Sequence, residues 1–360
     1  MGLPSGLDGA ASSAGLTALI GSLVFIFPVL IWYRYSERIA SSGGLYSFVE
    51  AAATRNLARV QAGFWIASYF LYLVYTVPFI AYDLLPVVFP GIDRYSLLLD
   101  GLIAALITAI MLTPLLFTLS LMAAIAVVQF IIGVVLVAVT IVHLGAPASS
   151  FVGHGNLRAI LPPAGNTSLL YVCASLPLFL GGEVRGGTRS VQRALAWAFP
   201  AVVALVIIAA IPLANASGSV LSDTIPGVSL AQASSGRTFA VIVGLGVAVS
   251  VGGLIVAEFL ALTRLVATVF NKPKQRMVQV IAALFLIASL ISLANPRAAY
   301  STLLKPSLIA LWISQLLVVA VYPWFVARHR KLAVGDLALA GAASLLMVFG
   351  VYSAATSATT

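Results

Sequence analysis

Charged residues are scarce in this sequence. They make up 8% of its 360 residues, whereas a soluble chain carries about 25%. Such a small number of charges cannot cover a water-facing surface, which excludes a soluble globular enzyme, a disordered chain and a nucleic-acid-binding protein. Cysteine is nearly absent as well. Cys173 is the only one, so an internal disulfide, a CxxC pair and a cysteine zinc cage are excluded.

Motifs for catalysis and for metal binding are also missing. The sequence contains no HExxH, P-loop or GxSxG pattern, and its three histidines lie far apart along the chain. An enzyme that works inside a membrane would need acids or histidines clustered at a membrane face, and the sequence shows no such cluster. We therefore expect no enzymatic activity, no cofactor and no metal site.

Long apolar runs are abundant. Hydrophobic residues make up 61% of the chain, and the mean hydropathy is +1.11. A spanning helix needs about 20 mostly apolar residues, and about ten segments meet this requirement. The runs are continuous rather than alternating, which excludes an outer-membrane barrel. The predicted fold class is an all-α polytopic membrane protein. Its spans are expected at 13–35, 60–88, 96–117, 119–144, 167–183, 193–215, 238–266, 277–294, 306–327 and 333–354.

The positive charges predict the orientation of the spans. Of the 19 Lys and Arg residues, 14 fall in one set of loops. This larger set belongs on the cytoplasmic side, because short cytoplasmic loops are enriched in Lys and Arg. The sequence therefore predicts a multi-pass protein of the cell (plasma) membrane. The smaller, outer set consists of Arg94, Arg158, Arg237, Arg297 and Lys305.

The start of the chain is unusual for this topology. Ten spans with this orientation place both ends outside, and residues 1–12 carry no Lys or Arg. The first residues, Met1–Gly6, have neither the basic region nor the apolar region of a signal peptide. We expect that one further spanning helix belongs upstream. The alternative is a true outside start whose insertion is driven by the downstream charges.

Two glutamates fall inside predicted spans, Glu183 and Glu258. A charged side chain at that depth costs about 2.5–3.5 kcal/mol on insertion scales, so each is a candidate residue for ion coupling or gating. The alternative for Glu258 is a neutral carboxylic acid that hydrogen-bonds a neighbouring carbonyl. Asp83, Asp100 and Asp336 lie near span ends, where we expect them to reach headgroup water.

The segment 175–183 combines features that weaken a helix. Pro177 removes a backbone donor and clashes with the preceding turn, and Gly181 and Gly182 weaken the helix further. A broken helix survives in a membrane only where its bare backbone lines a cavity or is covered by protein. In transporters such a break forms the substrate site. The alternative is a simple proline kink with glycines that allow close helix packing.

Four short motifs along the chain carry a family resemblance. Residues 41–49 read SSGGLYSFV, residues 63–65 read GFW, residues 179–183 read FLGGE and residues 188–194 read TRSVQRA. They resemble, in order, the P-x-G-G-x-Y-x-y, G-F-x-x-G-W, F-x-G-x-E and P-R-x-I-P-R-A signatures of the amino acid–polyamine–organocation (APC) superfamily, although the prolines of the last motif are lost. The resemblance covers nearly the whole chain.

The resemblance implies a LeuT-type fold of two inverted five-helix repeats. The chain would be a single transmembrane transporter domain over 1–360, with a first, N-terminally incomplete repeat at about 1–144, a second repeat at about 167–327 and an extra helix at about 333–354. The family's first helix, with its glycine-rich break, has no counterpart in this sequence. This agrees with the upstream helix expected from the charges.

The resemblance also implies a substrate site around the broken helix. Phe179 would be a gate or cavity aromatic, and Glu183 would be a candidate proton sensor beside the break. Glu258 lies on the helix that helps form the sodium site in sodium-coupled relatives. The residues expected to bind substrate are Ser68, Tyr72, Ser175, Leu178, Phe179, Leu180, Gly181 and Gly182.

The function implied is secondary active transport of an amino acid or related organic amine by alternating access. The coupling ion, H⁺ or Na⁺, stays open, as does the oligomeric state. The partners expected are a small-molecule substrate and membrane lipid. Two other classes remain: a permease-like sensor that binds substrate without moving it, and an integral membrane enzyme. A transporter of inorganic cations is a variant of the first reading.

Overall fold

The computed structural model describes residues 13–356 apart from 153–159, 161–163, 165–166, 169, 222 and 224. The described residues form helices and the turns that connect them, and none of them lies in a strand. The all-α prediction is therefore confirmed for this part of the chain. The expectation of a helix upstream of Met1–Gly6 concerns a region outside the described residues.

Nine helices or runs of consecutive helices among the described residues are long and apolar enough to cross a membrane. In chain order they are α2 (Ala14–Ser36); α4 (Arg55–Pro78) with the π-helix η1 (Phe79–Leu84) and α5 (Leu85–Val88); η2 (Ile92–Tyr95) with α6 (Ser96–Met111); α7 (Leu115–Leu144); α9 (Thr188–Ala210) with η5 (Ile211–Asn215); α12 (Arg237–Phe270); α13 (Lys274–Ser292); α14 (Pro296–Ala320) with α15 (Tyr322–His329); and α16 (Val334–Thr356).

Shorter helices connect these spans or lie between them. They are α3 (Leu45–Ala52), η3 (Ala148–Phe151), η4 (Val172–Leu180), α10 (Gly218–Leu221) and α11 (Pro226–Ser235).

Nine of the ten predicted spans correspond to these long helices. A break between the third and fourth spans is found, but it lies at residues 112–114 rather than at residue 118, because α6 ends at Met111 and α7 begins at Leu115 after Pro114. The predicted start of the ninth span at residue 306 is wrong. α14 begins at Pro296, because the Asn295 side chain caps it by accepting from the Ala298 N–H at 3.2 Å. The tenth prediction, 167–183, is described only in part and contains the short helix η4.

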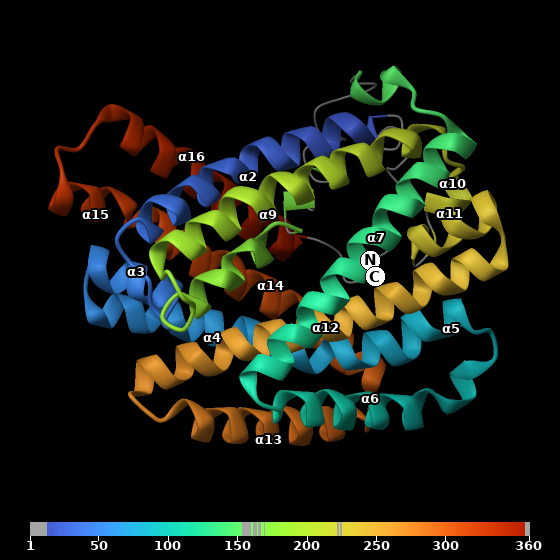
Figure 1. The fold of residues 1–360 in the computed structure, drawn as a ribbon, viewed down its shortest axis with the longest axis horizontal. Helices are drawn as coiled ribbons and strands as arrows, with labels where there is room; N and C mark the ends of the chain where they lie inside the picture. The colour runs from blue at the N-terminus through green and yellow to red at the C-terminus, as the bar shows by residue number, and fades with distance from the viewer. Residues whose placement is uncertain are drawn as a thin grey trace.

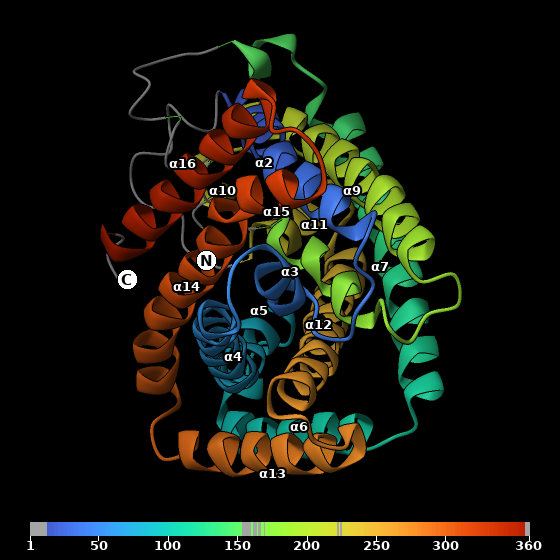
Figure 2. The same cartoon turned by 90° about the vertical axis from the view of Figure 1, so that its left-hand side faces the viewer.

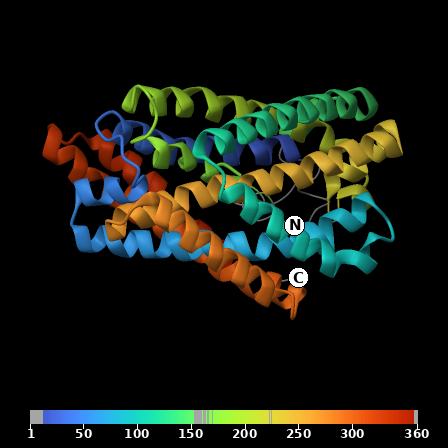
Figure 3. The same ribbon diagram turned by 60° about the horizontal axis from the view of Figure 1, so that its bottom comes forward.

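The long helix α12 lies at the centre of the packing. It contacts α4, α7, α13 and η4, and in Figure 3 it runs between α7 and α4. α2 and α9 lie side by side along one side of the molecule in Figure 1, and α14 packs between α4 and α16. α12 therefore brings its own polar residues against both η4 and α4.

The distribution of apolar residues fits a lipid environment. α7 buries only Thr118 and Thr140, although it is a 30-residue apolar helix. Its large side chains are exposed instead, including Leu116 at 78% and Val142 at 87%. An apolar surface of this kind would be unstable in water and is stable against acyl chains. The chain is therefore a multi-pass membrane protein.

The segments rich in Lys and Arg gather at one end of the molecule. Figure 1 shows α3, the turn between α15 and α16, and the start of α13 at this end, and Figure 2 looks onto it. Lys274, at the start of α13, bonds Ser42 in the loop before α3, and Arg328 of α15 donates to the carbonyl of Ala51. We call this the basic end, and the charge distribution predicts that it faces the cytoplasm.

Two of the three aspartates expected in headgroup water are buried instead. Asp100 of α6 is 0% exposed and Asp336 of α16 is 2% exposed, whereas Asp83 is half-buried. Asp336 is covered by two arginines, Arg34 and Arg330. Position near a span end was therefore a poor guide, because neighbouring helices cover these side chains.

Candidate functional site

The segment predicted to break is not α-helical. Val172–Leu180 forms the 3-10 helix η4 with Pro177 inside it, and a series of turns follows from Gly181 to Gly187 before α9 begins. A 3-10 helix is tighter than an α-helix and has poorer hydrogen-bond geometry, and its end groups lack partners within the helix. The predicted departure from a regular α-helix is therefore observed. It lies against α12 and α9 in the interior of the protein.

Two glycines, Gly44 and Gly182, allow the loop before α3 to approach η4 and the turn after it closely. Gly44 has a φ of +53°, and a Cβ at this position would lie 2.4 Å from the ring of Phe179. A Cβ on Gly182 would lie 2.8 Å from Oγ of Ser42. Any larger residue would collide with its neighbour, so the motif at 41–49 and the motif at 179–183 form one packed contact.

Glu183 lies in an ion cluster at the basic end. Its Oε1 accepts from Nζ of Lys274 at 2.6 Å, and its Oε2 accepts from Nη2 of Arg264 at 3.2 Å. Oγ of Ser42 accepts from the same Lys274 ammonium at 3.2 Å. The cluster joins the turn after η4 to α12, to α13 and to the loop before α3.

The surroundings of Glu183 favour its charged form. Burial raises the pKa of this carboxyl, but the hydrogen bond from Lys274 and the charges of Arg264 and Lys274 outweigh the burial, so the pKa of Glu183 is lowered from its ordinary value. The side chain of Arg264 is only 6% exposed. Its charge therefore depends on Glu183 for compensation.

Aromatic side chains of α4 pack on one another, and one of them packs against the end of η4. Trp65 stacks on Tyr69 with ring centroids 3.7 Å apart, and the Trp65 ring lies 4.5 Å from the Phe179 ring. The rings of Tyr72 and Tyr75 pack edge to face in a T-shaped arrangement, with centroids 5.4 Å apart. Trp65 and Phe179 are fully buried. Together with the Gly44 contact they join α4, the end of η4 and the loop before α3 in one packed contact.

Glu258 of α12 faces the beginning of η4. It is 3% exposed, and its Oε1 accepts from the Cys173 thiol at 3.6 Å. Its Oε2 is buried and has no hydrogen-bond partner among the described residues. Tyr69, Tyr72 and Tyr75 are close enough to interact electrostatically with this carboxylate. A carboxylate with an unused oxygen, beside three tyrosines, is suited to a cation.

The predicted substrate residues do not all lie together in the structure. Tyr72 lies with Glu258, and Ser175 and Leu178 lie in η4, where Oγ of Ser175 donates to the carbonyl of Val172 at 2.9 Å. Ser68 lies at the contact of α4 with α14, because its carbonyl accepts from Oγ of Ser307 at 2.8 Å. Phe179, Leu180, Gly181, Gly182 and Glu183 form the end of η4 and the turn that follows it.

Three residues of the site were not predicted from the sequence. Cys173 was used only to exclude disulfides, although it lies four residues before Pro177 in the weakened segment. Arg264 and Lys274 were counted only as topology charges. Arg264 could have been identified as a candidate site residue, because it is a charged residue inside the predicted span 238–266.

A metal centre is not evident in the described part of the chain. No group of three or more His, Cys, Asp and Glu residues there could hold a metal ion. Glu258 and Cys173 provide two donors of the right kind, which is fewer than a protein-bound metal usually receives.

Comparison with known proteins gives a match at the level of structure. No protein-family model matches the sequence, and no curated protein matches it. Two crystal structures of variants of the Eremococcus coleocola manganese transporter do match. For one, the TM-score is 0.58 at 14% identity, over 96% of this chain and 83% of the transporter chain. For the other, the TM-score is 0.59 at 13% identity, over the same shares of each chain. The chain has the fold of these transporters.

Proposed function

We propose that the protein is a secondary active transporter for an amino acid or related organic amine. Transport would proceed by alternating access around η4 and α12, in an APC-type permease with two inverted repeats. The observation that carries the proposal is the buried carboxylate of Glu258. Its Oε2 finds no bond within the described residues, and Glu258 lies beside η4, a short 3-10 helix packed among long spans.

A protonated amine fits this arrangement. It would bond Oε2 of Glu258, and the rings of Tyr69 and Tyr72 would stabilise its charge. The backbone of η4 and of the following glycines would supply polar groups for the rest of the substrate, as interrupted helices do in other transporters. Ser175, Leu178 and Phe179 would line this side of the site.

The two glutamates would have different roles. Glu258 would couple transport to protons, because a proton and a substrate ammonium would compete for the same carboxylate. Glu183 would act in gating, since its two cationic partners keep it ionised at neutral pH and tie η4 to the basic end. Opening toward the cytoplasm would require this cluster and the contact between Gly44 and Phe179 to separate.

The test is counterflow in proteoliposomes. Vesicles are loaded with unlabelled amino acids and amines, and entry of the labelled compounds is followed with and without sodium and at two pH values. The expected result is saturable entry that depends on pH. Binding without entry would instead identify a sensor, and conversion of the compound would identify an enzyme.

A second candidate is transport of a divalent metal ion. The printed descriptions of the structurally similar proteins, which are manganese transporters, favour it. The donor set argues against it, because Glu258 and Cys173 are joined by no third His, Cys, Asp or Glu in the described ranges. A Mn²⁺-quenched dye inside the same vesicles separates the two candidates. Entry of Mn²⁺ without entry of any organic compound would replace the first proposal by the second.

A further inference from the structure

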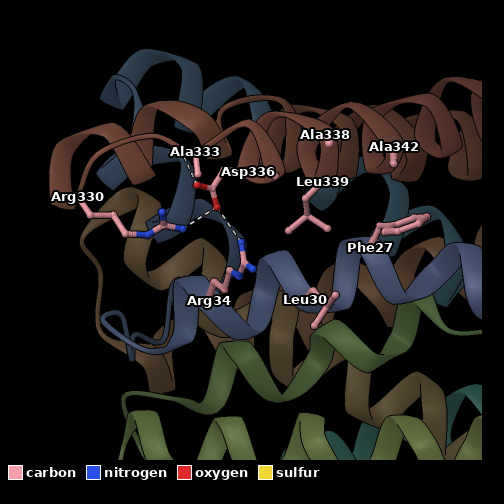
Figure 4. Close-up of a pocket in the computed structure, with 10 residues that line it drawn as sticks. Phe27, Leu30, Arg34, Arg330, Ala333, Asp336, Ala338, Leu339 and Ala342 are labelled. Atoms are coloured by element: carbon pink, nitrogen blue, oxygen red, sulfur yellow. Dashed lines mark hydrogen bonds and ion pairs between the residues drawn. The ribbon is translucent and has the colours of Figure 1, made fainter.

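A pocket of about 600 Å³ lies between α2 and α16 at the basic end. It is separate from the candidate substrate site around η4 and α12. Figure 4 shows it as a groove with an apolar part along the helices and a charged part at the turn before α16. The residues that matter here are Phe27, Leu30 and Leu339 on the apolar side and Arg34, Arg330 and Asp336 on the charged side.

The charged part carries an excess of positive charge. Oδ1 of Asp336 accepts from Nη1 of Arg34 at 2.8 Å and from Nη2 of Arg330 at 2.6 Å. Its Oδ2 accepts from the backbone N–H of Ala333 at 3.1 Å. One carboxylate thus holds two guanidinium groups and leaves a net charge of one positive unit.

The arginines remain available to a ligand, whereas the carboxylate does not. The side chain of Asp336 is 3% exposed, but those of Arg34 and Arg330 are 39% and 50% exposed. Arg34 makes its bonds to Asp336 and to the Tyr322 hydroxyl through Nη1 alone. Each guanidinium carries five N–H donors, and its fork matches the geometry of a phosphate.

The apolar part runs along helices that are long and apolar enough to span a membrane. Phe27 and Leu30 are 36% and 42% exposed although they belong to a spanning helix. From Phe27 to Arg34 the helix rises about 10 Å. A groove that is apolar over this length and cationic at its basic end matches a lipid rather than a soluble phosphate compound.

We propose that this groove binds an anionic phospholipid of the cytoplasmic leaflet. The phosphate would lie between Arg34 and Arg330, and one acyl chain would lie along Phe27, Leu30 and Leu339. Basic pockets between spanning helices on the cytoplasmic side are sites for anionic headgroups. The excess positive charge selects an anionic lipid over a zwitterionic one. The proposal is independent of what the protein transports.

The test is native mass spectrometry of the full chain in detergent, titrated with phosphatidylglycerol or with phosphatidylcholine of the same acyl chains. Phosphatidylglycerol is expected to bind more tightly. Each arginine near an anionic lipid contributes a factor of about five, so the double variant Arg34→Gln/Arg330→Gln is expected to bind phosphatidylglycerol about 25-fold more weakly. Arg276→Gln, at an exposed position of the same basic end, is the control and is expected to bind as the wild type does.

A second variant tests the groove without disturbing the ions. Ala338 lines the pocket and is exposed, so Ala338→Trp would fill the acyl part and leave Asp336 paired. Leu345→Trp, on the same helix outside the lining and at a position 72% exposed, is its control. The lipid is expected to be lost from the first variant and kept by the second. Equal affinity of the wild type for the two lipids would overturn the proposal, as would unchanged binding in Ala338→Trp, or a protein dimer whose formation excludes the lipid.

Discussion

Glu258 combines a buried carboxyl group with an incomplete set of hydrogen bonds. Cys173 supplies a weak donor to Oε1, and nothing in the described chain bonds Oε2. A lone buried carboxylate is costly unless a proton or a cation joins it. If a substrate ammonium and a proton compete for Glu258, acid conditions should weaken substrate binding, because protonation removes the negative charge that holds the amine.

The first prediction follows from this competition. In the wild type, the apparent affinity for the transported amine should fall as the pH falls. Glu258→Gln keeps the shape of the side chain but cannot ionise, so it should remove the pH dependence. It should also weaken binding by about 1.5–3 kcal/mol, the value of a hydrogen bond to a charged group. Counterflow at several pH values measures both effects.

The control for this experiment is Glu37→Gln. Glu37 is exposed at the end of α2, so the variant makes the same chemical change away from the site. It should transport as the wild type does. An unchanged pH profile in Glu258→Gln would assign proton coupling to another residue.

Gly44 shows how one residue can decide whether two segments meet. A Cβ there would collide with the Phe179 ring, and the backbone has a positive φ as well. Gly44→Ala should therefore lower the thermal stability in detergent and open the contact. Gly91→Ala is the matched control, because Gly91 has a φ of +88° but no atom within 4 Å of its would-be Cβ. Gly91→Ala should cost about 1–2 kcal/mol from the backbone alone, and Gly44→Ala about 1–3 kcal/mol more from overpacking. Equal stability losses would mean that Phe179 moves aside freely.

At the scale of elements, the Glu183 cluster holds η4, α12, α13 and the loop before α3 together. Removing the charge of Glu183 leaves Arg264 buried without compensation, which costs about 3–5 kcal/mol when a buried pair loses one partner. Glu183→Gln should therefore favour opening at the basic end. Cys173 is the only cysteine and thus a built-in reporter. Its reaction with a thiol reagent supplied at the cytoplasmic face should become about tenfold faster or more.

Glu50→Gln is the control for the cluster. Glu50 forms an ion pair with Arg55 at 3.7 Å, but both side chains are well exposed, so the labelling rate of Cys173 should change little in this variant.

The strength of the Glu183 cluster should also depend on pH, and only in one direction. A carboxyl with a lowered pKa stabilises the folded contact above the ordinary carboxyl range and loses this effect as the pH falls through its own pKa. At each pH, the Cys173 rate in Glu183→Gln divided by the rate in the wild type cancels the ionisation of the thiol itself. This ratio should stay constant around neutrality and fall toward one only in acid, below the ordinary carboxyl range. A change of the ratio near pH 7 would contradict this.

The elements that could be predicted were those with a local signal. A span must satisfy its own backbone bonds, so 20 apolar residues suffice to identify it. The start of α14 was missed because Arg297 and Lys305 make its first turns polar, while its capping bond involves only neighbouring residues. The weakened segment was visible through Pro177 and its glycines.

The contacts between elements could not be predicted in the same way. Cys173 and Glu258 lie 85 positions apart, and Ser42 and Lys274 lie 232 positions apart. Hydropathy predicts that Glu258 lies inside a span, but it does not predict which residues Glu258 contacts in the folded protein. The family resemblance identified the motif at 41–49 and the motif at 179–183 separately. Only the packing of these two segments against each other shows why each of them contains glycine.

At the scale of the whole molecule, the distribution of Lys and Arg residues predicts the orientation of the protein in the membrane. The segments that carry 14 of the 19 Lys and Arg residues gather at the basic end. The Phe179 ring, which packs on Trp65, and the Glu183 cluster both contact the loop before α3 at this end. If this end faces the cytoplasm, the proposed gate and the proposed lipid groove both face the cytoplasm. The orientation of the protein in the membrane therefore determines on which side the proposed gate and the proposed lipid groove lie.

Single-cysteine labelling tests the orientation in intact cells. In a Cys173→Ser background, Asp93→Cys reports the turn before α6, and Lys272→Cys reports the turn between α12 and α13; both positions are exposed. A membrane-impermeant maleimide should label Asp93→Cys in intact cells and Lys272→Cys only after permeabilisation, because short cytoplasmic loops carry the Lys and Arg excess. The reverse pattern would put the Glu183 cluster on the outer face, and Glu183→Gln should then expose Cys173 to reagents from outside. It would also remove the anionic leaflet from the groove at Arg34 and Arg330, so one labelling experiment constrains the gate and the lipid site together.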